Sequence, residues 1–317
     1  MTGAADTPAS LGFRLPAEWE PHEATWLIWP HNRDDWPGKL AAIHWIYGEI
    51  VRKLAAGETA RILVGSEAVE RKARRVLTRV GLAAERFELI RCPTDRAWTR
   101  DTGPIFVRDA KGQRAIVRFC FNGWARYDNC QQDDRIAELV AERLGCPLFH
   151  AQHDGRALVL EGGAVEVNGR GTLLATEECL LDPAVQVRNP GLERAGYEDA
   201  LRDHLGATNV LWLGRGIAGD DTHGHVDDFC RFVRPRTVVL CQEPSLVDEN
   251  HRALEVNRDR LVGMRLEDGS KIELVRLPMP APLFFDGQRL PASYANFYFA
   301  NAAVLVPTFN DPNDRLA

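Results

Sequence analysis

The chain has 317 residues and a net charge of −6, with 45% hydrophobic and 26% charged residues, the composition of a globular protein with a sizeable core. It contains no basic block, so neither nucleic acid nor an anionic membrane surface is an expected partner. No apolar run approaches the ~18 residues that span a bilayer, and no signal peptide is recognisable, so we expect a cytoplasmic protein.

Hydrophobic periodicity predicts strands and helices in regular succession along the chain. After a flexible lead-in over residues 1–15, the pattern predicts helices at 38–56, 67–80, 132–144, 191–204 and 246–261. It predicts strands at 24–29, 61–64, 86–91, 104–108, 115–121, 157–160, 163–167, 171–175, 209–213, 225–233, 237–241, 271–276 and 302–306. This alternation favours an α/β fold, and no Gly/Ser-rich or Pro-rich linker divides it, so residues 1–317 are expected to form a single domain.

The seven cysteines include no C-x-x-C pair, which argues against both a disulfide framework and a zinc knuckle. Cys120, Cys230 and Cys241 occupy apolar, strand-like runs, where a cysteine is usually a small buried hydrophobic residue. The cysteines therefore predict neither a metal site nor disulfide cross-links.

Polar residues cluster in three Gly-containing segments at strand ends, where loops present functional groups from a rigid sheet. These segments are 98–104, 160–163 and 219–228. Taken singly, Asp101 fits a β-turn, Glu161 fits a solvated hairpin residue, and His225 and Asp227 fit a structural pair on one strand face.

Together the same four residues suit a guanidinium substrate. Carboxylates such as Asp101 and Asp227 can hold its planar array of N–H donors from two sides. Addition to the central carbon needs a strong nucleophile such as a thiolate. His225 can protonate the leaving ammonia and later activate water, and Glu161 can orient the imidazole.

Five motifs in order then resemble the agmatine deiminase and bacterial peptidylarginine deiminase family, over essentially the whole chain. They are Glu18–Trp26 with Trp29–Asn32, Trp98–Pro104, Glu161–Gly163 with Thr176–Leu181, His223–Asp227, and Pro291–Tyr298. The resemblance implies a pentein fold, a pseudo-fivefold α/β propeller of ββαβ modules, whose last module is incomplete here.

The resemblance also implies a reaction and a role for each motif residue. Asp101 and Asp227 would clamp the guanidinium, His225 would be the general acid/base, Glu161 the second carboxylate, and Trp98 a wall of the substrate pocket. His223 receives no role. The implied reaction converts agmatine to N-carbamoylputrescine and ammonia, which feeds putrescine synthesis. It requires no metal or organic cofactor, and a homo-oligomer is left open.

The chain departs from the family pattern at the nucleophile. The family's cysteine follows a histidine in a Gly-rich segment near the C-terminus, and no Gly-x-x-His-Cys pattern occurs in these 317 residues. We therefore expect a truncated form whose catalytic cysteine lies outside this sequence and which is inactive as it stands. Cys230, five residues after His225, would face the opposite side of the predicted strand and is not expected to substitute.

Three alternatives remain open from the sequence. Arg126 lies in the segment 119–129, which differs from the agmatine deiminase pattern, so protein arginine or another guanidino compound is an alternative substrate. His223 and His225 with their neighbouring aspartates could instead form the site of a metal hydrolase. The protein could also bind guanidino compounds without converting them.

Overall fold

The computed structural model describes residues 6–317 and shows a mixed α/β fold. Its first unit is a parallel sheet in the order β1-β2-β3, covered by two helices. The elements are β1 (Ala24–Ile28), α1 (Leu40–Leu54), β2 (Thr59–Val64), α2 (Glu67–Arg79) and β3 (Phe87–Arg91). The helices pack on the sheet through Val51, Leu77 and Ile62, which are all buried. The Ser66 side chain accepts a hydrogen bond from the Val69 amide and so caps α2.

Three further units share one topology, in which an antiparallel strand pair is followed by a helix and a parallel strand. The second unit has β4 (Ile105–Arg108), β5 (Arg114–Arg118), α4 (Ile136–Leu144) and β6 (Leu148–His150). The third has β9 (Glu166–Val167), β10 (Thr172–Thr176), α6 (Arg194–Leu205) and β11 (Asn209–Leu213). The fourth has β12 (Cys230–Arg234), β13 (Thr237–Gln242), α7 (Glu249–Gly263) and β14 (Glu273–Pro278).

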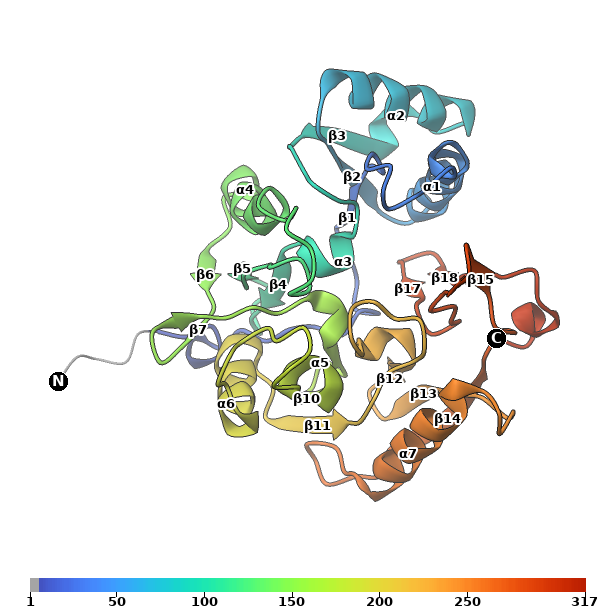
Figure 1. Cartoon of the computed structure of the whole chain (residues 1–317). Helices are drawn as coiled ribbons and strands as arrows, with labels where there is room; N and C mark the ends of the chain where they lie inside the picture. The colour runs from blue at the N-terminus through green and yellow to red at the C-terminus, as the bar shows by residue number, and fades with distance from the viewer. Residues whose placement is uncertain (1–5) are drawn as a thin grey trace.

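The long helices lie on the outside of the molecule, and the short helix α3 (Thr99–Thr102) lies near its middle (Figure 1). The remaining elements are short. They are η1 (Ala9–Leu11), η2 (Ala84–Arg86), η3 (Asp133–Arg135), β7 (Gln152–His153), β8 (Arg156–Ala157), η4 (Gly162–Ala164), α5 (Glu177–Leu181), η5 (Val226–Asp228), β15 (Phe284–Phe285), β16 (Gln288–Arg289), β17 (Tyr298–Phe299), β18 (Val304–Leu305) and η6 (Pro312–Arg315). No helix among residues 6–317 has the length and apolar character needed to cross a membrane.

The predicted helices are all present with shifted ends, but three predicted strands are largely wrong. The segment 163–167 begins within the 3-10 helix η4, and only Glu166 and Val167 form a strand. The segment 225–233 begins as the 3-10 helix η5, and its strand starts only at Cys230. The segment 157–160 contributes only Ala157 to a strand, β8. Val226, Leu158 and Leu160 are core residues, which explains their apolar character. Val159 pairs with Cys120 only as an isolated parallel bridge, so residues 158–160 form no regular strand.

The described part of the expected flexible lead-in is attached to the rest of the chain. The amide of Arg14 donates a hydrogen bond to the carbonyl of Arg108, and the amide of Leu15 donates one to Leu205. Phe13 and Leu15 also pack against an apolar cluster. For residues 6–15, these contacts contradict the expected flexible lead-in, and residues 1–5 lie outside the described residues.

Candidate active site

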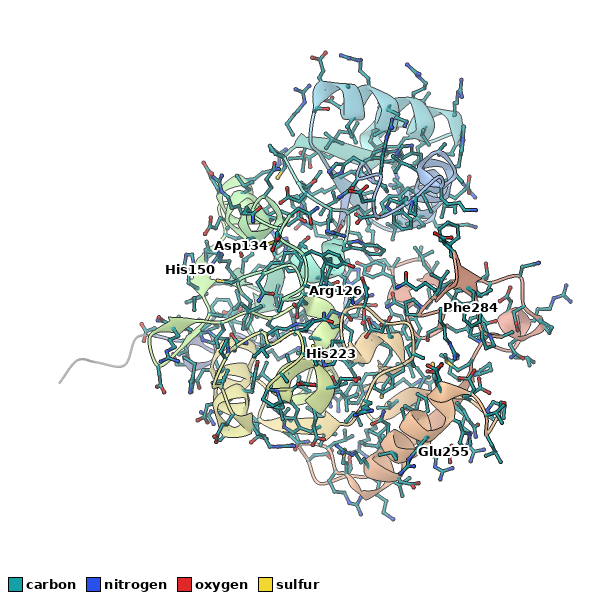
Figure 2. The ribbon with its side chains drawn as sticks, in the orientation of Figure 1. Arg126, Asp134, His150, His223, Glu255 and Phe284 are labelled. Atoms are coloured by element: carbon teal, nitrogen blue, oxygen red, sulfur yellow. The ribbon has the colours of Figure 1, made fainter. Side chains whose placement is uncertain are left out.

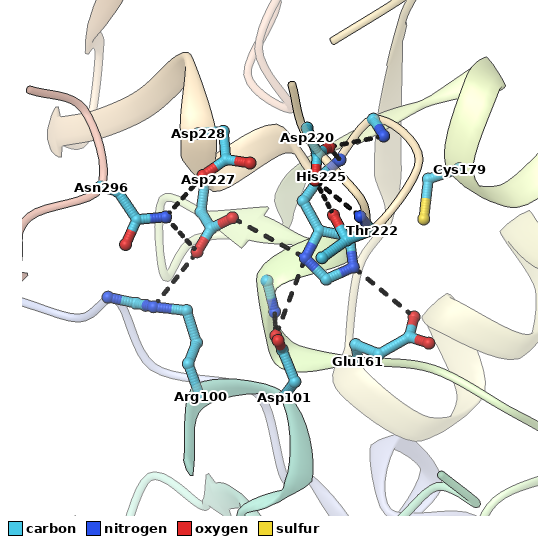
Figure 3. A network of polar contacts seen from close by, with 12 residues as sticks. Arg100, Asp101, Glu161, Cys179, Asp220, Thr222, His225, Asp227, Asp228 and Asn296 are labelled. Atoms are coloured by element: carbon cyan, nitrogen blue, oxygen red, sulfur yellow. Dashed lines mark hydrogen bonds and ion pairs between the residues drawn. The ribbon is translucent and has the colours of Figure 1, made fainter. Parts of the chain in front are cut away.

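Three short helical turns carry the four predicted catalytic residues to one place (Figure 3). Asp101 lies in α3, Glu161 directly precedes η4, and His225 and Asp227 lie at the start of η5. The turns pack against one another, with η4 between α3 and η5. Residues that are more than 120 positions apart in the sequence therefore meet, as predicted by their assignment to one guanidinium site.

The His225 imidazole lies at the centre of this group and is 3% exposed. Its Nδ1 is 3.7 Å from Asp101 Oδ1 and 4.0 Å from Asp227 Oδ1. Its Nε2 is 3.8 Å from Glu161 Oε2 on the other edge of the ring. The two aspartates thus converge on one side of the imidazole, and the glutamate lies on the other side (Figure 3).

Gly163 provides the floor of the space between the aspartates. A Cβ atom at this position would lie 2.6 Å from His225 Nδ1, 2.7 Å from Asp101 Oδ1 and 3.1 Å from Asp227 Oδ1. Its amide donates a hydrogen bond to Asp101 Oδ1 at 3.1 Å. Only glycine leaves this space free, which explains the second glycine after Glu161.

Each aspartate is fixed through its second oxygen. Trp124 Nε1 donates a hydrogen bond to Asp101 Oδ2 at 3.2 Å. Arg100 Nε lies 3.2 Å from Asp227 Oδ2, and Asn296 Nδ2 donates to the same oxygen at 3.3 Å. The Oδ1 atoms of both aspartates therefore point toward the shared space beside the imidazole.

Glu161 forms a fully buried ion pair with Arg188, whose Nε lies 3.1 Å from Glu161 Oε1. Both side chains are 0% exposed. A buried carboxylate without a cation would be costly, so Arg188 allows Glu161 to remain charged beside the imidazole.

Burial and neighbouring charges shift the pKa values of these groups. Burial raises the pKa of Asp101 to about 6, with His225 opposing the shift and the charges of Asp227 and Glu161 adding to it. Burial lowers the pKa of His225, but the charge of Asp101 and the neighbouring Cys179 and Glu161 side chains outweigh it and hold this pKa well above its usual value. Burial raises the pKa of Glu161, yet His225 and Arg188 bring it below its ordinary value.

The loop before His225 is shaped by Asp220, whose carboxylate accepts hydrogen bonds from the amides of Gly224 and His225 at 2.7 and 3.0 Å. His223 turns away within this loop, and its Nε2 lies 3.0 Å from Asp182 Oδ2. The two histidines therefore do not converge on a common point. This arrangement contradicts the metal-hydrolase alternative based on His223 and His225.

Cys179 is the cysteine that lies beside His225, and it is 2% exposed. It lies near Glu161 and Nε2, on the edge of the ring away from Asp227 (Figure 3). Cys230 is fully buried in an apolar cluster, where burial raises its thiol pKa well above the ordinary value. His225 and Cys230 do not share a strand as predicted, because His225 precedes the 3-10 helix η5 and the strand starts only at Cys230.

Residues 14–317 match the family model described as Porphyromonas-type peptidyl-arginine deiminase. The chain belongs to this family. An agmatine deiminase of Ectopseudomonas mendocina is 33% identical over 340 residues, covering 100% of this chain and 89% of the relative. The agmatine deiminase of Enterococcus faecalis has a solved structure with a TM-score of 0.87 and 31% identity, covering 100% of this chain and 88% of that one. A C. jejuni agmatine deiminase with substrate bound has a TM-score of 0.84 and 27% identity, covering 96% of this chain and 85% of that one.

Membership of this peptidyl-arginine deiminase family confirms the enzyme class expected from the sequence, a hydrolase of guanidino C–N bonds. It also confirms a mixed α/β fold shared with the solved agmatine deiminases.

Two further residues named from the sequence lie next to residues of the site in the chain. Trp98 directly precedes α3, is 40% exposed and stacks on Trp36 with ring centroids 5.3 Å apart. Arg126 and His223 lie close to the middle of the molecule (Figure 2). The Arg126 guanidinium donates to the Asp221 carbonyl at 3.4 Å and lies 5.5 Å from the Tyr127 ring.

Five residues of the site received no role from sequence reasoning. Four of them lie in segments that the sequence had already singled out, and Arg188 lies in a stretch with no motif. They are Arg100, Trp124, Cys179, Asn296 and Arg188. Their part in the site depends on tertiary contacts, which no local pattern in the sequence indicates.

Proposed function

We propose that this protein catalyses the hydrolytic deimination of a guanidinium compound, with agmatine as the first candidate substrate. The observation that carries the proposal is the convergence of Asp101 Oδ1 and Asp227 Oδ1 on one edge of the His225 imidazole. The agmatine deiminase names of the similar proteins support this choice of substrate.

The two carboxylates would hold the substrate in the space above Gly163. A guanidinium presents paired N–H donors along its edges, which match carboxylate oxygens in a charge-assisted arrangement. Asp101 and Asp227 offer one oxygen each to this space, because their second oxygens are engaged by Trp124 and Arg100. Trp98, as a pocket wall, would cover the aliphatic part of the substrate.

His225 would move the protons of the reaction. In the covalent route, a thiolate adds to the central carbon, and His225 gives a proton to the departing nitrogen, which leaves as ammonia. Water then attacks the thiouronium carbon and gives a proton back to His225, and the carbon–sulfur bond breaks to release the ureido product. Glu161, charged and held by Arg188, would orient the imidazole through both steps.

The thiolate of this route has to approach from the aspartate side of His225. Within residues 6–317, Cys179 is the thiol beside the imidazole, and it lies on the other side. The contribution that we propose for the described residues is therefore substrate binding, proton transfer and orientation.

We further propose that the units form a pseudo-fivefold propeller. The shared strand–strand–helix–strand topology of three units supports this arrangement. The outward helices and the central position of α3 support it as well.

Calorimetry and an ammonia-release assay on the whole chain would test the proposed function. Agmatine should bind, whereas putrescine, which has the same amine but no guanidinium, should not. Asp227→Asn should weaken agmatine binding by on the order of 10²-fold, and Asp199→Asn, a change at an exposed aspartate, should not affect it. Equal binding of both ligands would overturn the clamp. We expect this chain to bind agmatine without releasing ammonia, because Cys179, the thiol beside His225, lies away from the aspartates. Ammonia release by this chain would overturn that assignment of the nucleophile, and failure to bind agmatine would overturn the proposed function.

A further inference from the structure

Three atoms that can coordinate a metal ion lie close together on the side of His225 that faces away from the aspartates. Glu161, Cys179 and His225 each offer one such atom, and these atoms all lie within 4.8 Å of one another. The three residues are 0%, 2% and 3% exposed. Among residues 6–317, this is the group of three with the composition and spacing of a metal site.

Two of these atoms are buried without any hydrogen-bond partner in the described chain, namely Glu161 Oε2 and His225 Nε2. Leaving a buried polar atom unpaired costs about 1–3 kcal/mol, and more for a charged group. Arg188 contacts only the other oxygen of Glu161, Oε1, and so leaves Oε2 directed at the space shared with the thiol and the imidazole.

The spacing of these atoms suits a tetrahedral ion. Zinc bonds of about 2.0–2.3 Å to oxygen, nitrogen and sulfur place neighbouring ligand atoms roughly 3.3–3.8 Å apart. Glu161 Oε2 and His225 Nε2 are 3.8 Å apart, so small side-chain shifts would close the site around an ion. A thiolate, an imidazole and a carboxylate together select a borderline-soft divalent ion over magnesium or calcium.

We propose that Glu161, Cys179 and His225 bind one Zn²⁺-like divalent transition-metal ion, and that the bound ion inhibits the site. The ion would take the lone pair of His225 Nε2 and one oxygen of Glu161, so the imidazole could no longer exchange a proton at that nitrogen. It would lie on the side of the ring away from the guanidinium clamp, where it could not activate water against a clamped substrate. The metal site goes beyond the proposed deimination and does not depend on it, whereas the inhibition rests on that proposed function.

Titration of the metal-free whole chain with Co²⁺ tests the site directly, because a thiolate bound to cobalt gives a charge-transfer absorption band. We expect one Co²⁺ per chain, a sulfur-to-cobalt band, and loss of this band on addition of Zn²⁺. Cys179→Ser should remove the band and weaken Zn²⁺ binding at least about 10²-fold. Cys241→Ser, at an equally buried cysteine in another cluster, should keep both.

A band that persists in Cys179→Ser, or no band in the unchanged chain, would overturn the proposal. Glu161→Gln provides a second variant if Cys179→Ser does not fold. It should keep the sulfur-to-cobalt band but weaken Zn²⁺ binding about 10-fold, since one charged ligand becomes neutral. Unchanged Zn²⁺ affinity in Glu161→Gln would also count against the site.

Discussion

Arg100 and Asp227 form an ion pair inside the candidate active site, with Arg100 Nε 3.2 Å from Asp227 Oδ2. A guanidinium of the chain itself thus lies against the carboxylate that we propose for binding the substrate guanidinium. Arg100 also donates to Glu18 Oε2 at 2.5 Å and to the Phe297 carbonyl at 3.0 Å. This one side chain therefore ties Asp227 to an N-terminal segment and to a segment near the end of the described chain.

Replacing Arg100 by lysine should weaken agmatine binding about 10-fold and lower the free energy of unfolding by about 1–3 kcal/mol. A single ammonium cannot reach Glu18, Phe297 and Asp227 together, so Asp227 would lose its fixed orientation. Calorimetry and urea unfolding measure the two effects. Arg14→Lys, in the half-exposed pair with Glu20, should change neither, and wild-type binding by Arg100→Lys would contradict the role.

Gly163→Ala should weaken agmatine binding by on the order of 10²-fold, or abolish it, while the chain stays folded. The added methyl would lie within about 3 Å of His225, Asp101 and Asp227, in the space that we assign to the guanidinium. Gly65→Ala is the matched control, because a Cβ atom there meets nothing within 4 Å and its φ is not positive. Circular dichroism checks folding and calorimetry checks binding; normal affinity in Gly163→Ala would place the substrate elsewhere.

Agmatine affinity should rise about 10-fold between pH 5 and pH 7. Burial raises the pKa of Asp101 to about 6, and only its ionised form provides the negative charge that pairs with a guanidinium cation. The same raised pKa means that Asp101 favours the folded state at low pH, a contribution lost as the pH rises from the ordinary value of 3.8 through about 6. Calorimetry across this range measures the affinity.

Asp101→Asn should bind agmatine weakly at every pH and show no rise in affinity between pH 5 and pH 7. Asp199→Asn should show the same rise in affinity as the unchanged chain. An affinity that is flat from pH 5 to pH 7 in the unchanged chain would show that ionisation of Asp101 does not control binding.

Arg188→Met should lower the free energy of unfolding by about 3–5 kcal/mol, because it leaves Glu161 as an unpaired buried carboxylate. Urea unfolding at neutral pH measures the loss. Arg71→Met, in the exposed pair with Glu67 on α2, should cost under about 0.5 kcal/mol. If the two variants lose similar stability, the buried pair does not have the importance that its geometry suggests.

Local sequence chemistry was sufficient for the five long helices and for naming the four proposed catalytic residues. The apolar spacing and Ser66 cap of α2 appear in the structure as predicted, because such signals act within a few neighbouring residues. The motifs around Asp101, Glu161, His225 and Asp227 named the groups that the fold brings together.

Tertiary structure alone decided how those groups are held. The sequence pattern placed His225 and Asp227 on one strand face, but the chain forms the 3-10 helix η5 there. Val226 is buried in the core, and the Asp220 carboxylate accepts hydrogen bonds from the amides just before η5. Nothing local marked Arg188 as the partner of Glu161 or placed Cys179 beside the imidazole. Such pairings arise from packing between segments far apart in the sequence, where buried charges need partners that only the folded chain can supply.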